Sequence, residues 1–214
     1  MPGPESRRRT LLTQEAARLM VEEGIKDFAA AKRKAARHLG GSPNTAKDLP
    51  TNREVQDEVE LRLRMYRDTP DARALLRRLR EAALAAMHFF ADYRPRLVGS
   101  VLSGAVTEHS DVNLHLFAET PEEVEILLHD SGIPFERTER RHTVAGKGEA
   151  FPAITLMVDG VRVAATVFPE EGIRQAPRST VTGKPEERAK INQVEALLAA
   201  DEGEPLVPGT GTGA

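Results

Sequence analysis

The sequence predicts an α+β protein in which a helical N-terminal domain precedes a small mixed sheet with flanking helices. Through the first 92 residues, apolar side chains recur at steps of three and four, which is typical of amphipathic helices. After Pro95 the apolar segments become short, rich in valine and leucine, and bounded by turn residues, which is typical of strands. We therefore divide the chain into a helical domain at 1–93, an α/β domain at 94–172, and a C-terminal helix with a disordered tail at 173–214.

Four helices are predicted in the first domain, and three of them begin at recognisable caps. Asp27 precedes the second helix, Thr51 and Glu54 have the spacing of a capping box, and Thr69 precedes a proline at the first helical position. Glycines after the first two helices mark their ends. The predicted helices cover 13–23, 28–39, 51–68 and 69–90.

The second half alternates predicted strands and helices. Asp159-Gly160 between two apolar runs is the strongest hairpin signal in the chain. Gly146-Lys147-Gly148 is predicted to be a mobile loop, and the glycine-rich end at 203–214 to be disordered. The predicted strands are 96–102, 112–117, 134–138, 154–158 and 161–168, and the helices are 119–131 and 185–200.

The composition excludes several classes of protein. There is no cysteine, so disulfide frameworks, thiolate nucleophiles and cysteine-type zinc sites are ruled out. No apolar run approaches a membrane span and no secretory leader is recognisable, so we expect a cytoplasmic protein without a membrane partner. The nine aromatic residues argue against a stacking platform for single-stranded nucleic acid.

Charge is distributed unevenly along the chain. Residues 1–96 carry 20 Lys/Arg against 14 Asp/Glu, whereas the remaining residues carry 10 against 19. The basic helices permit nucleic-acid binding, and electrostatic attraction between the two halves is an equally good interpretation. The sequence does not give the oligomeric state.

The segment 97–117 combines features that suit phosphate binding. The pair Gly99-Ser100 at a strand end lets backbone N–H groups and a hydroxyl approach phosphate oxygens, because glycine has no Cβ to block them. On the next predicted strand, alternation places Asp111, Asn113 and His115 on one face, opposite a buried apolar face.

This segment resembles the nucleotidyltransferases of the DNA polymerase β superfamily, whose signature is Gly-Ser after a strand, then Asp-apolar-Asp-apolar on the next strand. About 20 residues carry the resemblance, and the element order extends it weakly to residue 168. It implies a nucleoside triphosphate bound at Gly99 and Ser100. It also implies Mg²⁺ held by Asp111 and Asn113, which would be the catalytic pair in nucleotidyl transfer to a hydroxyl.

Two of the three carboxylates that the superfamily uses are missing. Asn113 stands at the second position, and the strand 161–168 offers only alanines and a threonine for the third. Glu108, His109 and His115 are possible substitutes, and Arg137, Arg140 and Arg141 are within reach of a phosphate if their strand borders the cleft. Two functions therefore stay open: an NTP- and Mg²⁺-dependent transferase, or a catalytically degenerate protein that binds a nucleotide or a partner as a regulator or interaction module. A further carboxylate beside Asp111, such as Glu108, Glu170 or Glu171, would favour the transferase.

Overall fold

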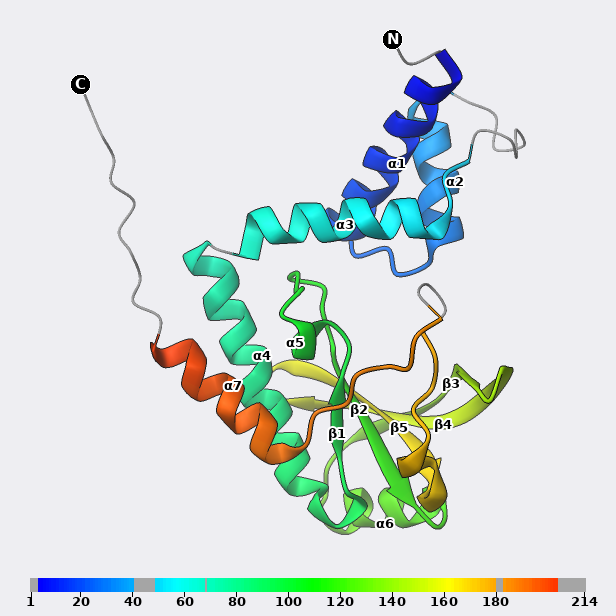
Figure 1. Cartoon of the computed structure of the whole chain (residues 1–214). Coiled ribbons are helices and arrows are strands. Elements are labelled where there is room, and N and C mark those ends of the chain that lie inside the picture. The colour runs from blue at the N-terminus through cyan, green and yellow to red at the C-terminus, as the bar shows by residue number, and fades with distance from the viewer. Residues whose placement is uncertain (1–3, 41–48, 68, 180–182, 204–214) are drawn as a thin grey trace, which may run out of the picture.

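The computed structural model describes residues 4–40, 49–67, 69–179 and 183–203, and it confirms the predicted α+β class (Figure 1). The predicted disordered tail at 204–214 lies outside the described residues. The helices are α1 Pro4–Glu22, α2 Phe28–His38, α3 Asn52–Arg67, α4 Pro70–Phe89, α5 Ser100–Ser103, α6 Pro121–Asp130 and α7 Ile191–Gly203, with short 3-10 turns η1 Ala91–Tyr93 and η2 Glu170–Arg174. The strands are β1 Arg96–Val98, β2 Val112–Ala118, β3 Phe135–Val144, β4 Lys147–Val158 and β5 Val161–Pro169.

The strands form one mixed sheet in the order β1-β2-β5-β4-β3. Only β2 and β5 pair in parallel, with Asn113 opposite Ala164 and His115 opposite Thr166. The other neighbours are antiparallel. Residues 183–190 cross in front of β2 to β1, where Leu97 and Ala189 exchange two backbone hydrogen bonds of 2.9 Å (Figure 1).

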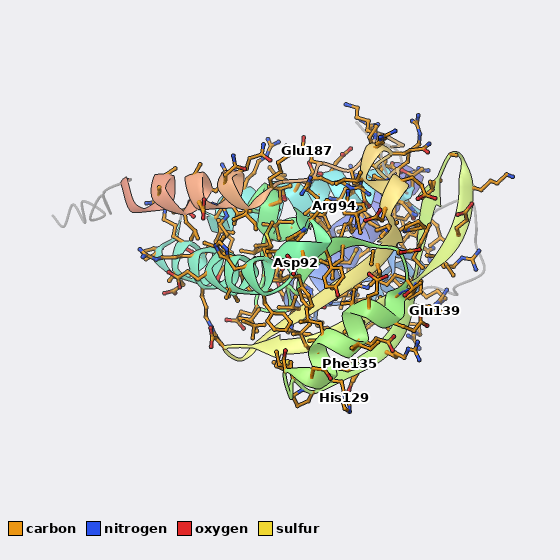
Figure 2. All side chains as sticks on the ribbon, turned by 90° about the horizontal axis from the view of Figure 1, so that it is seen from below. Asp92, Arg94, His129, Phe135, Glu139 and Glu187 are labelled. Atoms are coloured by element: carbon orange, nitrogen blue, oxygen red, sulfur yellow. The ribbon has the colours of Figure 1, made fainter. Side chains whose placement is uncertain are left out.

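Apolar side chains gather in two separate clusters. The first holds α1, α2 and α3 together through small residues such as Ala16 and Ala35 and through Leu19 and Val55. The second lies on one face of the sheet and includes residues of α4, α6 and α7. Helices α4 and α7 run side by side along this unit (Figure 2). The clusters thus divide between α3 and α4, whereas the segmentation predicted from the sequence divides at residues 93 and 94.

The predicted helix caps are formed. The Asp27 carboxylate accepts from the Ala30 amide at 2.6 Å, and the Thr69 hydroxyl accepts from the Ala72 amide at 3.2 Å. The capping box is complete, because the Thr51 amide donates to Glu54 at 2.7 Å and the Glu54 amide donates to the Thr51 hydroxyl at 3.1 Å.

Several boundaries differ from the sequence prediction: α1 begins at Pro4 rather than at 13, β3 extends to Val144 rather than to 138, and β4 begins at Lys147 rather than at 154. The predicted strand 96–102 stops at Val98, because Gly99 takes φ 76° and ψ −150° and the chain then turns into α5. The predicted mobile loop is instead a tight turn with positive φ at Ala145 and Gly146, and Lys147 already pairs in β4. Helix α7 begins six residues later than predicted, because residues 185–190 run along the sheet.

A search of the described helices finds none with both the length and the hydropathy needed to span a bilayer.

Candidate functional site

A cleft of about 600 Å³ lies between α3 and the face of the sheet that α4 does not cover. Its floor includes side chains from β2, β3 and β5, and its rim includes Gln56 and Leu63 of α3 and Glu187 of the segment before α7. The cleft is also lined by Gly99, Ser100, Asn113, His115, Arg140, His142, Thr166 and Glu186.

Strand β2 positions the polar side chains of the cleft by simple alternation. Val112, Leu114 and Leu116 belong to the apolar cluster beneath the sheet, so Asn113 and His115 face the other way. The sequence predicted this polar row, and the structure places two of its three members in the cleft.

Three of the four predicted site residues line this cleft, namely Gly99, Ser100 and Asn113. Asp111 does not. Its carboxylate lies 2.5 Å from the ammonium of Lys26, which belongs to the loop between α1 and α2, and it borders a smaller hollow with Glu108. The Asn113 side-chain amide donates to the backbone carbonyl of Asp111 at 3.2 Å, and not to its carboxylate.

The Asn113 side chain is engaged by a cation. Arg140 on β3 donates from Nη1 to Asn113 Oδ1 at 2.6 Å. Burial lowers the pKa of the Arg140 guanidinium, and Asp111 partly opposes this by raising it. The positive charge of Arg140 is thus held where the resemblance places a metal ion. The sequence had identified Arg140 only as a residue within possible reach of a phosphate.

No carboxylate occupies the third position of the superfamily's pattern. Ala164, opposite Asn113, is almost fully buried, and so is the next residue on that face, Thr166. Glu170 pairs instead with Arg94 at 2.6 Å. The described residues that line the cleft therefore include the Arg140 guanidinium and the carboxylates of Glu186 and Glu187, but no carboxylate from β2 or β5.

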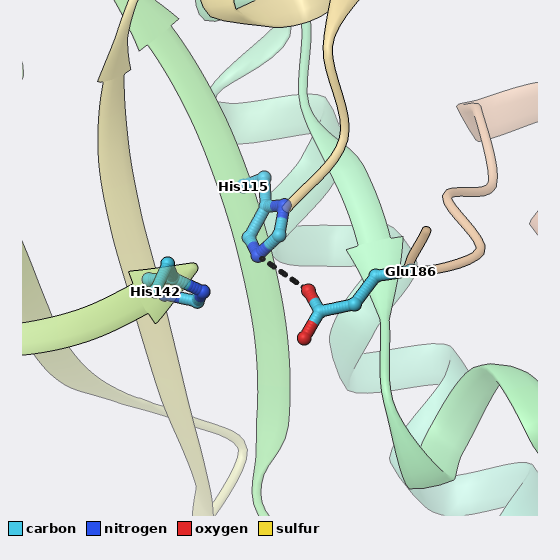
Figure 3. A group of neighbouring side chains, drawn as sticks. All are labelled: His115, His142 and Glu186. Atoms are coloured by element: carbon cyan, nitrogen blue, oxygen red, sulfur yellow. Dashed lines mark ion pairs between the residues drawn. The ribbon is translucent and has the colours of Figure 1, made fainter. Parts of the chain in front are cut away.

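The other end of the cleft carries two imidazoles and a carboxylate from three different segments, His115 on β2, His142 on β3 and Glu186 before α7 (Figure 3). One ligand atom from each lies within 4.8 Å of the other two, and His115 Nε2 is 3.7 Å from Glu186 Oε2. This group can hold a metal ion.

Burial dominates the electrostatics of this group. Burial, together with the nearby positive charges of Arg188 and Arg140, lowers the pKa of His115 to about 2 and that of His142 to about 4. Burial also raises the pKa of Glu186, against the opposing effect of Arg188. Both imidazoles are accordingly neutral near pH 7.

Arg188 fixes the position of His115. Its guanidinium lies over the rings of Phe117 and Phe168, 5.1 and 5.6 Å from their centroids. Its Nε donates to His115 Nδ1 at 3.1 Å, and its Nη1 donates to the Gly172 carbonyl at 3.1 Å. Because His115 Nδ1 accepts this bond, the proton of the neutral imidazole is on Nε2.

Sequence reasoning missed His142, Glu186 and Arg188 as site residues. His142 lies beyond the strand predicted at 134–138, and the other two lie in the helix predicted at 185–200. The register of β3 on β4 and the path of 183–190 across the sheet bring them to His115. The predicted substitutes Glu108 and His109 lie outside the cleft but border the same smaller hollow as Asp111, and His109 Nε2 contacts the Glu22 carbonyl at 3.0 Å.

Neither a protein-family model nor a curated protein matches this chain. The function is therefore inferred from the geometry of the cleft. One end offers a glycine turn, a hydroxyl and a guanidinium, which suit an anion, and the other offers imidazole and carboxylate ligands.

Proposed function

We propose that this chain is a nucleotidyltransferase-like protein that binds the phosphates of a nucleoside triphosphate in the cleft and has lost the metal-dependent transfer reaction. The observation that carries the proposal is the 2.6 Å hydrogen bond from Arg140 to Asn113. A guanidinium at this point supplies the positive charge that a carboxylate-held Mg²⁺ would otherwise supply. Arginine also offers several donors in a planar array that matches phosphate oxygens.

Gly99 lines the same cleft as Arg140, and its backbone also suits a phosphate ligand. Gly99 has a φ of 76°, which residues with a side chain rarely adopt without strain, and the absence of a Cβ leaves the backbone beside the Asn113 amide uncovered. Ser100 follows at the rim of the same cleft and adds a hydroxyl. A phosphate seated between Gly99 and Arg140 would meet donors from both sides.

The charges around Asp111 and Asn113 support loss of transfer. Mg²⁺ at these residues would have to displace Lys26 from one oxygen and Arg140 from the other. Nothing on β5 would compensate, because Ala164 stands where the third acid is needed. A regulatory role through nucleotide binding is the function that this arrangement favours over catalysis.

Two further parts of the proposal concern partners and location. Nucleic-acid binding by the basic helices receives little support from α2, where Lys32 donates to the Pro50 carbonyl and Lys34 pairs with Glu23. We also propose a cytoplasmic location, because a nucleoside triphosphate ligand is available there.

Equilibrium titration of the full chain with ATP, GTP, CTP and UTP in EDTA tests the proposal. We expect binding by the wild type, and a loss of about 10- to 100-fold in Arg140→Met, because a hydrogen bond to a charged group contributes about 1.5–3 kcal/mol. Arg141→Met is the matched control, since Arg141 is the adjacent residue on β3 and donates only to the Gly148 carbonyl. Absence of binding at millimolar nucleotide, or equal losses in both variants, would overturn the proposal.

A further inference from the structure

We infer that His115, His142 and Glu186 form a binding site for a first-row transition metal ion such as Zn²⁺ or Mn²⁺. The three side chains come from β2, β3 and the segment before α7. The fold thus brings together residues that are up to 71 positions apart in the sequence. The site is separate from the Asp111 and Asn113 positions and does not depend on nucleotide binding.

The first argument is that the three groups converge without satisfying one another. His115 Nε2 and Glu186 Oε2 are 3.7 Å apart, which is too long for a hydrogen bond (Figure 3). His142 Nε2 is buried and has no hydrogen-bond partner within the described part of the chain. Buried polar atoms without partners are costly, and an ion among these three would satisfy them together.

The second argument is that the geometry is close to that of a metal centre and accessible from solvent. Metal–ligand bonds of about 2.0–2.2 Å place neighbouring ligands roughly 3–3.5 Å apart, so donors within 4.8 Å need to close by at most about 1.5 Å. His115 is almost fully buried, whereas the side chain of Glu186 is 31 % exposed and borders the cleft. An ion can therefore enter from the cleft, and Glu186 can move to meet it.

The chemistry of the ligands selects the metal. Two imidazole nitrogens and one carboxylate suit zinc, manganese, iron, cobalt or nickel, whereas Mg²⁺ and Ca²⁺ prefer oxygen ligands throughout. Three protein ligands also leave at least one coordination position open, as in catalytic rather than structural zinc sites. That position would face the cleft.

Arg188 limits the affinity of this site. Its bond to His115 Nδ1 keeps the proton on Nε2, so metal binding at Nε2 requires that proton to move to Nδ1. The protonated Nδ1 then faces a donor, and the guanidinium must turn away. Arg188→Gln offers a carbonyl that can accept from Nδ1, which is the usual support for a metal-bound histidine. We expect this variant to bind metal on the order of tenfold more tightly.

The test is a titration of the full-length, untagged chain with Zn²⁺, Mn²⁺, Co²⁺ and Mg²⁺ after chelator treatment, with no nucleotide present. His142→Asn and Glu186→Gln should each weaken Zn²⁺ binding by more than about 100-fold, because loss of even an outer-shell partner costs 10- to 100-fold. His129→Asn and Glu139→Gln are the matched controls and should bind like the wild type. His129 is on α6, with its side chain 87 % exposed, and Glu139 is an exposed residue of β3 that does not line the cleft (Figure 2).

Circular dichroism confirms that each variant is folded, and the visible spectrum of bound Co²⁺ reports its ligands independently. Binding that survives both His142→Asn and Glu186→Gln, Mg²⁺ affinity equal to that of Zn²⁺, or no binding by wild type or Arg188→Gln at millimolar metal would each overturn the inference. Because nucleotide titrations in EDTA contain no free metal, their outcome is independent of this result.

Discussion

The two faces of β2 have different roles although they alternate along one strand. On one face, Leu114 and Leu116 are fully buried beneath α4. On the other, Asn113 and His115 meet charged or titratable groups from β3 and from the segment before α7. The first face is satisfied by apolar contact alone, whereas the second contains buried polar groups with unused hydrogen-bonding capacity.

This difference separates stability from binding. Apolar packing is favourable wherever water is excluded, so the face under α4 explains why the sheet folds. Burying imidazole and guanidinium groups is unfavourable unless partners compensate, so the cleft face is explained better by a ligand than by folding. Substitutions on the two faces should therefore change different properties.

The largest expected effect is on the apolar face. Leu116→Ala should lower the free energy of unfolding by about 2–5 kcal/mol, because it removes buried contacts and leaves a cavity. Nucleotide affinity per folded molecule should not change. Urea denaturation measures the loss, and Leu61→Ala on the exposed side of α3, with Leu61 53 % exposed, should cost less than about 0.5 kcal/mol. Similar losses in both variants would contradict the assignment of the faces.

Substitution of Gly99 should change both the stability of the fold and the affinity for nucleotide. Its φ of 76° and ψ of −150° are accessible almost only to glycine, so Gly99→Ala should cost about 1–3 kcal/mol of stability as well as weaken nucleotide binding. Gly148→Ala is a suitable control, since its added Cβ meets nothing closer than Arg141 at 3.8 Å. Thermal unfolding and ATP titration of both variants provide the comparison, and unchanged stability in Gly99→Ala would show that the turn relaxes freely.

Asn113→Asp should affect binding more than stability. It restores the superfamily's second carboxylate, but beside Arg140 this charge would neutralise the guanidinium and repel phosphate. We expect ATP affinity in EDTA to fall about tenfold, or about 1.4 kcal/mol. If affinity for ATP rises when Mg²⁺ is added to this variant alone, the position still supports metal and the arginine has replaced it only partly.

Much of this architecture could be predicted from the sequence. The caps at Asp27, Thr51 and Thr69 and the hairpin at Asp159-Gly160 are local signals, and local hydrogen bonds and turn geometry determine them. The alternation that points Asn113 into the cleft is equally local.

The rest of the site depends on contacts distant in sequence. Arg140 reaches Asn113 only through the register of β3 on β4 and of β4 on β5, and Arg188 reaches His115 across 73 residues. The resemblance implied that Asp111 binds metal, and no local pattern reveals its contact with Lys26, 85 residues away. The partners of charged side chains depend on which distant residues the complete fold brings close. Their pairing is therefore the part of the site that is hardest to predict from the sequence.

The most direct test of the central claim is the dependence of ATP affinity on Mg²⁺ and on Asp111. We predict that wild type and Asp111→Asn bind ATP within about twofold of each other, in EDTA and in excess Mg²⁺ alike, because Asp111 pairs with Lys26 outside the cleft and Arg140 supplies the charge. Calorimetric titration of the two proteins under both conditions measures this. ATP binding that requires Mg²⁺ and disappears in Asp111→Asn would contradict the account and restore a metal-dependent nucleotidyltransferase.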